Sequence, residues 1–202
     1  MMLALGGASI DGSAYQDVTG LAQRSPGWLD GAVTVWSAYG LALFGVLMIL
    51  GWWWARRAGA AAALTALAVP LTVVLAYGVN DVLKLLVRED RPCQSLRVRT
   101  LEVCPGHGDW SFPSNHAAIA AAAAVALLFV ARRLGTVACV AAVAMAASRV
   151  WVGVHYPHDV AVGLLVGGLV AFVTMLVVVR GSAALARRMT AAAPLRVLLT
   201  PS

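Results

Sequence analysis

Charged residues are scarce in this chain of 202 residues. They make up 12% of the sequence, against 61% hydrophobic residues, whereas a soluble domain is typically about 25% charged and about 45–50% apolar. Lysine is almost absent, since Lys84 stands alone beside fourteen arginines. The composition disfavours a soluble globular domain and favours an integral membrane protein, and the length suits a single domain.

Cysteine is also rare, and the three cysteines show none of the cysteine and histidine spacings that are typical of metal sites. The first twelve residues lack both a basic region and a long apolar run. We therefore expect no cleavable signal peptide.

Long apolar runs dominate the rest of the chain. A membrane-spanning helix needs about 20 largely apolar residues, and five segments qualify, namely residues 32–54, 59–87, 116–131, 134–150 and 160–179. The third and fourth are rich in alanine, and small residues let helices approach closely in lipid, so we expect these two to be the inner pair. The predicted fold is all-α, a polytopic membrane bundle of about five transmembrane helices plus an N-terminal interfacial helix.

The ends of the chain are more polar than its middle. Residues 1–31 are predicted to form an interfacial segment, with an amphipathic helix that ends near Pro26, although a disordered tail is the alternative. Residues 32–180 form the predicted transmembrane domain. Residues 181–202 form a predicted cytoplasmic basic tail, to which we assign no chemistry.

Charge is segregated between the two sets of loops. With the N-terminus outside, one side receives eight arginines and no acid, and the other side receives all nine acids. Basic residues favour the cytoplasmic side, so the acidic loops are expected to face the periplasm or the exterior. Cys93 and Cys104 share one of these outer loops, where disulfides persist, and a bond between them is an open alternative to free thiols.

Three polar clusters fall on this outer side. In the first, KLLVREDRP, Lys84, Arg88 and Arg91 are spaced so that a continuing helix would carry all three on one face, until Pro92 ends it. Snorkelling of basic side chains is the simpler explanation. These charges lie where the orientation rule disfavours them, however, and a functional role is therefore favoured.

The second cluster lies in WSFPSNHAAIAAAAA. Ser114 and Asn115 are expected to cap a helix, with His116 in its first turn. The unpaired N–H groups of a helix N-terminus attract anions. An ordinary capped helix would explain Ser114 and Asn115 but not the histidine, so the pattern predicts an anion site beside His116.

The third cluster is SRVWVGVHYPHD. Arg149 lies at the outer end of the fourth span, and His155 and Asp159 are one helical turn apart. An imidazole that donates one N–H to a carboxylate keeps its other nitrogen free to act as a nucleophile. His158 is a second candidate, but its adjacency to Asp159 in sequence does not aim its ring at that carboxylate.

Cations, backbone amides and histidines together suit one class of substrate. Phosphate monoesters and diphosphates are strongly anionic, and phosphoryl transfer depends mainly on charge neutralisation and positioning. The sequence therefore predicts a phosphate site on the outer side of the membrane.

The three motifs resemble those of the type-2 phosphatidic-acid phosphatase superfamily, which includes lipid phosphate phosphatases and undecaprenyl-diphosphate phosphatases and shares its site with vanadium haloperoxidases. The motifs of that family are K-x6-RP, PSGH and SR-x5-H-x3-D. Here they correspond to residues 84–92, 113–116 and 148–159, with every spacing retained. The one departure is Asn115 in place of glycine, which we expect to affect substrate preference more than chemistry.

The resemblance implies a role for each residue of the site. His155 would attack phosphorus and form a phosphohistidine, Asp159 would orient His155, and His116 would protonate the leaving oxygen and then activate water. The phosphate-binding residues would be Lys84, Arg91, Ser114, Asn115 and Arg149.

The resemblance also implies that no metal or other cofactor is needed, and we expect Glu89 and Asp90 to pair with neighbouring arginines rather than to bind magnesium. The expected partners are membrane lipids and a lipid phosphate or diphosphate. Polyprenyl diphosphate is favoured, with phosphatidylglycerophosphate or phosphatidic acid as the alternative. No nucleic acid is expected, and the oligomeric state stays open.

The alternative from another class is a non-enzymatic protein, either an anion permease or an assembly partner. A permease needs cations, but it does not need the pairing of His155 with Asp159. The expected location is the cell membrane, with the site facing the periplasm or exterior.

Overall fold

The computed structural model describes residues 8–96, 98–190 and 199. All regular secondary structure in these residues is helical. The signal-peptide prediction for residues 1–7 and most of the predicted basic tail beyond residue 190 lie outside the described residues. The helices are α1 (Ala8–Arg24), α2 (Gly27–Tyr39), α3 (Leu41–Ala58), α4 (Ala60–Val87), α5 (Pro92–Ser95), α6 (Asn115–Val130), α7 (Arg132–Trp151) and α8 (Pro157–Thr190).

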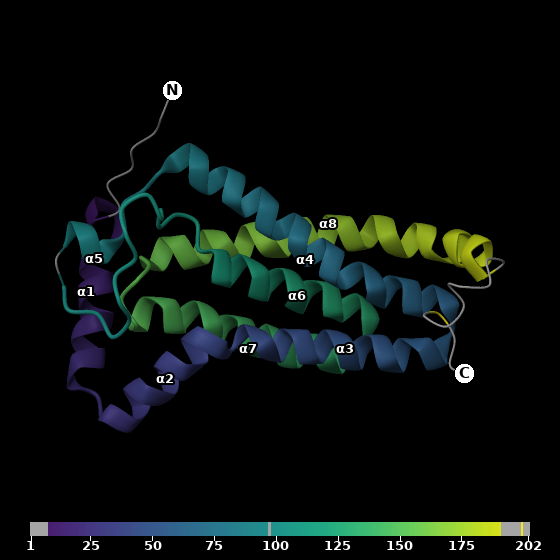
Figure 1. Cartoon of the computed structure of the whole chain (residues 1–202), viewed down its shortest axis with the longest axis horizontal. Helices are drawn as coiled ribbons and strands as arrows, with labels where there is room; N and C mark the ends of the chain where they lie inside the picture. The colour runs from purple at the N-terminus through teal and green to yellow at the C-terminus, as the bar shows by residue number, and fades with distance from the viewer. Residues whose placement is uncertain (1–7, 97, 191–198, 200–202) are drawn as a thin grey trace.

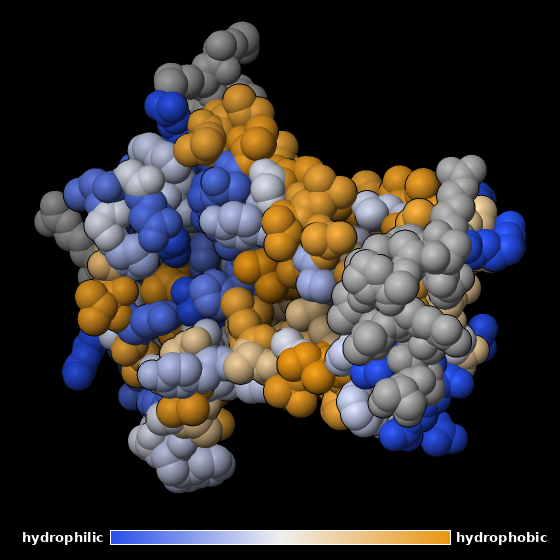
Figure 2. All heavy atoms as spheres, turned by 45° about the vertical axis from the view of Figure 1, so that its right-hand side comes forward, coloured by the Kyte–Doolittle hydropathy of each residue, from blue (hydrophilic) through white to orange (hydrophobic). Residues whose placement is uncertain are grey.

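The long helices form one elongated bundle (Figure 1). Helices α3, α4, α6, α7 and α8 run along its length, whereas α1, α5 and the outer loops gather at one end. Hydrophobic side chains cover much of the middle of the molecule, and hydrophilic ones gather toward its two ends (Figure 2). This banding is the pattern expected of a protein that spans a bilayer.

Three helical segments are long and apolar enough to cross a membrane, namely Ala60–Ser95, Arg132–Trp151 and Pro157–Arg187. The pair α2 and α3 qualifies as a fourth if it is taken as one span bent by 54°. Helix α6 is apolar but has only 16 residues. The all-α membrane bundle is confirmed. Three to four such spans qualify where five were expected, since α6 is too short to count as one. Other helices enclose α6, so it needs no long lipid-facing surface.

Helix α6 is the central helix of the bundle. Its buried side chains are almost all alanine, and it packs closely against α8 at two glycines. A Cβ atom on Gly163 would lie 2.5 Å from the carbonyl oxygen of Ser114, and one on Gly167 would overlap the Ala118 carbonyl. Glycine is therefore required where α8 crosses the start of α6.

The predicted inner pair of helices is half right. Helix α6 is buried on nearly all sides, but α7 exposes Val137, Val140 and Val143 on its outer face. Alanine content alone did not distinguish α6, a helix enclosed on all sides, from α7, a helix with one face exposed to lipid.

Helix α4 ends at Val87, where the predicted span 59–87 ends, and it does not continue to Pro92. Arg88 adopts a left-handed conformation with φ of 52°, and it ends the helix at Val87. The side chain of Arg88 is exposed and donates a hydrogen bond back to the carbonyl oxygen of Leu85. The expectation that Lys84, Arg88 and Arg91 share one helical face is therefore wrong for Arg88, and Pro92 begins α5 instead of ending α4.

The N-terminal segment is helical and docks on the bundle. Helix α1 ends at Arg24, close to Pro26, as expected. The hydroxyl of Tyr15 is buried and donates a hydrogen bond of 2.9 Å to the carbonyl oxygen of Gly153, just after α7. Helix α1 thus covers the end of the bundle where the motif loops meet, and its placement at the membrane interface stays a prediction.

The first predicted span, residues 32–54, is divided between α2 and α3. The break is at Gly40, where a Cβ atom would lie 2.5 Å from the carbonyl oxygen of Trp36 and 2.7 Å from Cε of Met145. The absence of a side chain at Gly40 allows the chain to bend against α7, so that α2 leans across the outer end of the bundle (Figure 1).

Candidate active site

The three motif regions meet at the end of the bundle that α1 and α5 cover (Figure 1). They are brought there by the end of α4, the start of α6, the end of α7 and the start of α8. The charged or polar residues of the motifs that are buried there are Lys84, Glu89, Arg91, Ser114, Ser148, Arg149, His155 and Asp159. Burial of so many polar groups is costly unless each is paired or awaits a ligand, and the partners are therefore informative.

His155 is oriented by Asp159. Its Nδ1 atom lies 3.3 Å from Oδ2 of Asp159. The same oxygen accepts a 2.7 Å hydrogen bond from the backbone N–H of Tyr156 and a short one from the hydroxyl of Ser111. Because a carboxylate only accepts, Nδ1 of His155 carries the proton, and Nε2 is left with its lone pair.

The second and third motifs are joined through Asp159. Its carbonyl oxygen accepts a 3.0 Å hydrogen bond from the backbone N–H of Ser114. The start of α6 is thereby fixed next to the turn that carries His155.

Arg91 faces the free nitrogen of His155. Its Nη1 atom lies 3.3 Å from Nε2 of His155 and donates a 3.0 Å hydrogen bond to the carbonyl oxygen of Val154. Its Nε and Nη2 atoms donate to Asp109, each at 2.8 Å. Arg91 is therefore held on both sides of its guanidinium group.

Burial, followed by the positive charges of Arg91, Arg149 and Lys84, lowers the pKa of His155 well below its usual value, so the imidazole is neutral near pH 7.

Two further cations complete the cluster. Lys84 donates a 2.7 Å hydrogen bond to the carbonyl oxygen of Trp110. Nη1 of Arg149 pairs with Glu102 at 2.9 Å and donates to the hydroxyl of Ser37 on α2. Among the described residues, Nε of Arg149 is buried and has no hydrogen-bonding partner. It is thus an unused donor within the cluster.

Both predicted catalytic histidines lie in the field of these cations. The charges of Lys84, Arg91 and Arg149 act on both His155 and His116, and His116 also acts on His155. The structure therefore brings the expected cations and both histidines to one place.

The start of α6 differs from an ordinary capped helix. Ser114 has the extended backbone of an N-cap residue, but its hydroxyl makes no capping bond and has no partner among the described residues. Asn115 begins the helix, and its side chain binds Asn80 of α4 instead. The expectation that Ser114 and Asn115 side chains cap the helix is therefore wrong. The first N–H groups of α6 are left for an anion, beside His116.

His158 lies outside this cluster, in a group of carboxylates. Its Nδ1 is 2.8 Å from Asp11, and its Nε2 is 3.1 Å from Glu89 and 3.4 Å from Oδ1 of Asp159. The expectation that its ring is not aimed at Asp159 is therefore wrong. Both ring nitrogens face acceptors, so both must donate, and the imidazole is protonated. This cation is already paired and is not a free nucleophile.

Glu89 takes His158 as its partner and not the neighbouring arginines that the sequence suggested. Potential ligand atoms of Glu89, His158 and Asp159 lie within 4.8 Å of one another, which is close enough for a metal ion. The protonated ring of His158, with Asp11 on its other nitrogen, accounts for the same arrangement as a charge-balanced group.

A disulfide bond joins Cys93 and Cys104, the pair singled out in the sequence. The bond closes part of the loop between Arg91 and Asp109, which also contains a 2.8 Å hydrogen bond from Gln94 to the carbonyl oxygen of Pro105. The loop that holds Arg91 in place is thus itself cross-linked.

Several contacts of the site were not predicted from sequence. Asp109 and Ser111 stand within five residues of the PSNH motif, and their polarity in a loop gave no reason to prefer them. Asn80 had a clearer signal, because it is an amide within an apolar run one helical turn before Lys84. The remaining unpredicted partners are Ser37, Glu102 and Tyr156.

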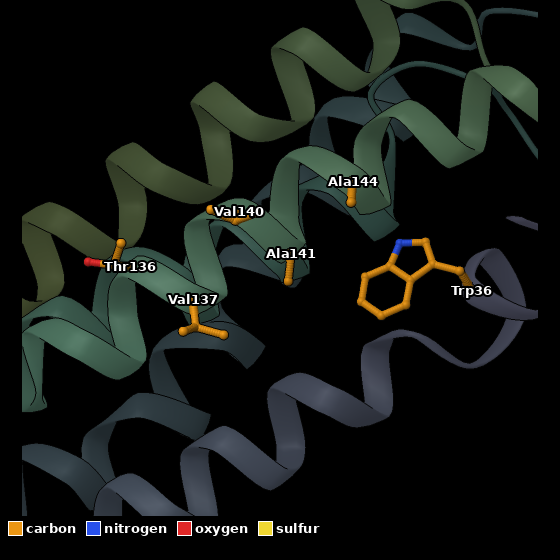
Figure 3. A pocket seen from close by; sticks show the side chains of 6 residues that line it. All are labelled: Trp36, Thr136, Val137, Val140, Ala141 and Ala144. Carbon is orange, nitrogen blue, oxygen red and sulfur yellow. The ribbon is translucent and has the colours of Figure 1, made fainter.

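Two apolar cavities lie along α7, and none of the three cations of the cluster lines either of them. One of ≈ 500 Å³ lies between Trp36 of α2 and the face of α7 that carries Val140 and Ala141 (Figure 3). A neighbouring cavity of ≈ 350 Å³ continues along α7 to Ser148 and Trp151. Their apolar walls do not suit a phosphate, which has its donors at the cation cluster.

Comparison with known proteins agrees with this arrangement. Residues 65–182, more than half of the chain, match the PAP2 superfamily, and all three motifs fall in this range. Undecaprenyl-diphosphatase BcrC of Bacillus subtilis is 29% identical over 144 residues, 71% of this chain and 72% of that protein. Undecaprenyl-diphosphatase of Sulfolobus acidocaldarius is 33% identical over 106 residues, 52% of this chain and 51% of that protein.

A solved structure shares the fold. The transmembrane PAP2 type phosphatidylglycerolphosphate phosphatase of Bacillus subtilis aligns with a TM-score of 0.58 and 24% identity, over 84% of each chain. The chain belongs to the PAP2 superfamily, and it is a membrane phosphatase of that family. The family and the class of enzyme expected from the three motifs are confirmed.

Proposed function

We propose that this phosphatase hydrolyses a lipid phosphate or diphosphate, and specifically polyprenyl diphosphate to the monophosphate and inorganic phosphate. One observation carries the proposal: a neutral His155, oriented by Asp159 through Nδ1, directs Nε2 toward Arg91 within a cluster of cations. The names of the relatives from Bacillus subtilis and Sulfolobus acidocaldarius support a polyprenyl diphosphate. The apolar cavities along α7, which continue to Ser148 beside Arg149, suit the hydrocarbon chain of a lipid.

In the first step, Nε2 of His155 attacks the terminal phosphorus. A P–N bond forms and the P–O bond to the leaving group breaks, while His116, which is protonated once the anionic substrate offsets the neighbouring cations, gives a proton to the leaving oxygen. Lys84, Arg91 and Arg149, with the hydroxyl of Ser114 and the N–H groups at the start of α6, neutralise the charge on the phosphoryl oxygens. The backbone N–H of Asn115 is one of these donors.

In the second step, His116 takes a proton from water and the water oxygen attacks the phosphohistidine. The P–N bond breaks, its electron pair returns to Nε2, and inorganic phosphate leaves. Asp159 stabilises the cationic state of the His155 ring in both steps, through the proton on Nδ1. The scheme requires no metal or other cofactor.

We assign the enzyme to the cell membrane, with its site facing the periplasm or exterior. Arg56 and Arg57 end α3, and Arg132 and Arg133 begin α7, at the end of the bundle opposite the motif residues. Basic residues favour the cytoplasmic side. In this assignment residues 32–180 form the phosphatase domain, residues 1–31 lie at the interface and residues 181–202 form the cytoplasmic tail.

The test is phosphate release by the purified protein in detergent. The panel contains polyprenyl diphosphate, phosphatidic acid, phosphatidylglycerophosphate and a soluble phosphoester, and we expect the highest kcat/KM on polyprenyl diphosphate. A higher value on either glycerophospholipid would contradict the assigned lipid. Folded protein that releases phosphate from none of the four would contradict the enzyme and favour a permease or assembly partner.

A further inference from the structure

A buried amide on α4 contacts the start of α6. Asn80 is fully buried, one helical turn before Lys84. Its Nδ2 atom donates a 3.2 Å hydrogen bond to the carbonyl oxygen of Pro113 and a 2.6 Å hydrogen bond to Oδ1 of Asn115. A polar side chain in the interior of an apolar bundle is costly and is retained where it serves a function. Neither partner of Asn80 belongs to its own helix, so the amide fixes something outside α4.

Hydrogen-bond chemistry fixes the orientation of both amides. The carbonyl oxygen of Pro113 can only accept, so Asn80 must present its NH2 group to it. The same NH2 group faces Asn115, which must therefore present its oxygen. The NH2 group of Asn115 is then directed away from Asn80. No described residue accepts a hydrogen bond from it, and the Asn115 side chain is only partly buried.

This free donor belongs to the first turn of α6, whose N–H groups form the proposed anion site. Asn115 is the first residue of α6 and precedes His116, the proposed proton donor to the leaving group. The transferred phosphoryl group already has three cations and the amides of α6. A neutral donor next to His116 is therefore available to the part of the substrate that leaves.

We infer that Asn80 is a positioning residue that holds the NH2 group of Asn115 toward the leaving group, and that this pair selects a diphosphate over a phosphate monoester. The inference rests on the proposed function. In a diphosphate the leaving group is itself a phosphate, whose anionic oxygens accept hydrogen bonds from the amide. In a phosphate monoester such as phosphatidic acid the leaving group is an uncharged alcohol, which His116 protonates and which offers the amide no anionic oxygen. A glycine at position 115 supplies no such donor.

The test is a double-mutant cycle read on two substrates. The variants are Asn80→Ala, Asn115→Gly and the two combined, and the measurement is kcat/KM on polyprenyl diphosphate and on phosphatidic acid. Each single substitution is expected to lower the ratio of kcat/KM on the diphosphate to kcat/KM on the monoester about two- to tenfold, the worth of a hydrogen bond. In the Asn115→Gly background, Asn80→Ala is expected to have no further effect.

The ratio of the two kcat/KM values is independent of the fraction of protein that folds, so partial misfolding of the Asn80→Ala variant does not obscure the result. Thr72→Val provides a matched control, because Thr72 is also buried on α4 but bonds to Ala68 and Met175. It is expected to leave the ratio unchanged.

Three outcomes would overturn the inference. Equal losses on both substrates, or a full additional loss in the Asn115→Gly background, would show that Asn80 has a purely structural role. No loss on either substrate would show that Asn80 is irrelevant to turnover. The proposed function would survive those outcomes. That function is tested separately, on the unmodified protein, by the panel of four substrates.

Discussion

The Nη1 atom of Arg91 lies 3.3 Å from Nε2 of His155. A permanent positive charge thus faces the nitrogen that is proposed to attack phosphorus. In the free enzyme this contact disfavours protonation of that nitrogen, which would destroy its lone pair. When substrate binds, the guanidinium group is already in place to pair with a phosphoryl oxygen.

The first prediction concerns pH. His155 acts only when neutral, so activity is present above its folded pKa and is lost as the pH falls through it. Because burial and Arg91 lower the pKa of His155, the acidic limb of the kcat/KM profile is expected below the ordinary histidine value of about 6.5. Arg91→Gln removes one lowering charge, and the limb is expected to move to higher pH in the residual activity.

The control for that shift is Arg99→Gln, which removes a positive charge from an exposed residue of the same loop. It is expected to leave the limb in place. A limb that stays fixed in Arg91→Gln, or moves in Arg99→Gln as well, would show that the contact between Arg91 and His155 does not set the titration.

The second prediction separates the two histidines. His155→Ala is expected to form no phosphoenzyme, because the nucleophile is missing. His116→Ala is expected to accumulate phosphohistidine on a diphosphate, whose leaving group departs without full protonation, since water is no longer activated. Labelling with substrate that carries radioactive terminal phosphate measures both, with an alkaline detergent quench because the P–N bond is labile in acid. His107→Ala, in an exposed loop, should turn over normally.

The third prediction concerns Ser111, whose hydroxyl donates to Asp159 and lies 3.4 Å from Nδ1 of His155. Ser111→Ala removes one of the donors that hold the Asp159 carboxylate, and kcat is expected to fall about tenfold, in line with the loss of a hydrogen bond to a charged group. KM should change little, because Ser111 contacts no phosphate-binding residue. Ser111→Thr retains the hydroxyl and should recover most of kcat. A large rise in KM with unchanged kcat would contradict a role through Asp159.

The fourth prediction concerns the packing of α8 on α6. Gly163→Ala places a methyl group 2.5 Å from the Ser114 carbonyl oxygen, and it is expected to destabilise the protein by about 1–3 kcal/mol. Gly168→Ala is the matched control, since its Cβ would meet only Val125 at an ordinary 3.7 Å. Thermal unfolding in detergent compares the two, and equal melting temperatures would contradict the close approach.

The sequence predicted best where the chemistry is fixed by local spacing. His155 and Asp159 are four residues apart, with His155 just before α8 and Asp159 in its first turn, so the short separation along the chain keeps the two side chains within reach. The convergence of the three clusters followed from topology, because alternate loops share one side of a membrane. In each case the prediction needed only distances along the chain.

The contacts that were missed depend on tertiary structure. Arg149 and Ser37 are 112 residues apart, and their bond exists only because the chain bends at Gly40. The left-handed end of α4 turns Arg88 away from Lys84, and no periodicity shows this. The ring of His158 faces Asp11 and Glu89 as well as the adjacent Asp159, because the fold brings all three carboxylates around it.

The part of the chain that matches the superfamily begins at residue 65, yet several supports of the site precede it. Asp11 holds His158, Tyr15 holds the turn at Gly153, and Ser37 holds Arg149. A protein shortened to residues 65–182 would keep every motif residue but would lose these three supporting hydrogen bonds. Shortened versions of the protein for crystallisation or engineering should therefore retain the first helix. The match to the superfamily identifies the reacting residues, but some of the residues that hold them in place lie outside the matched range.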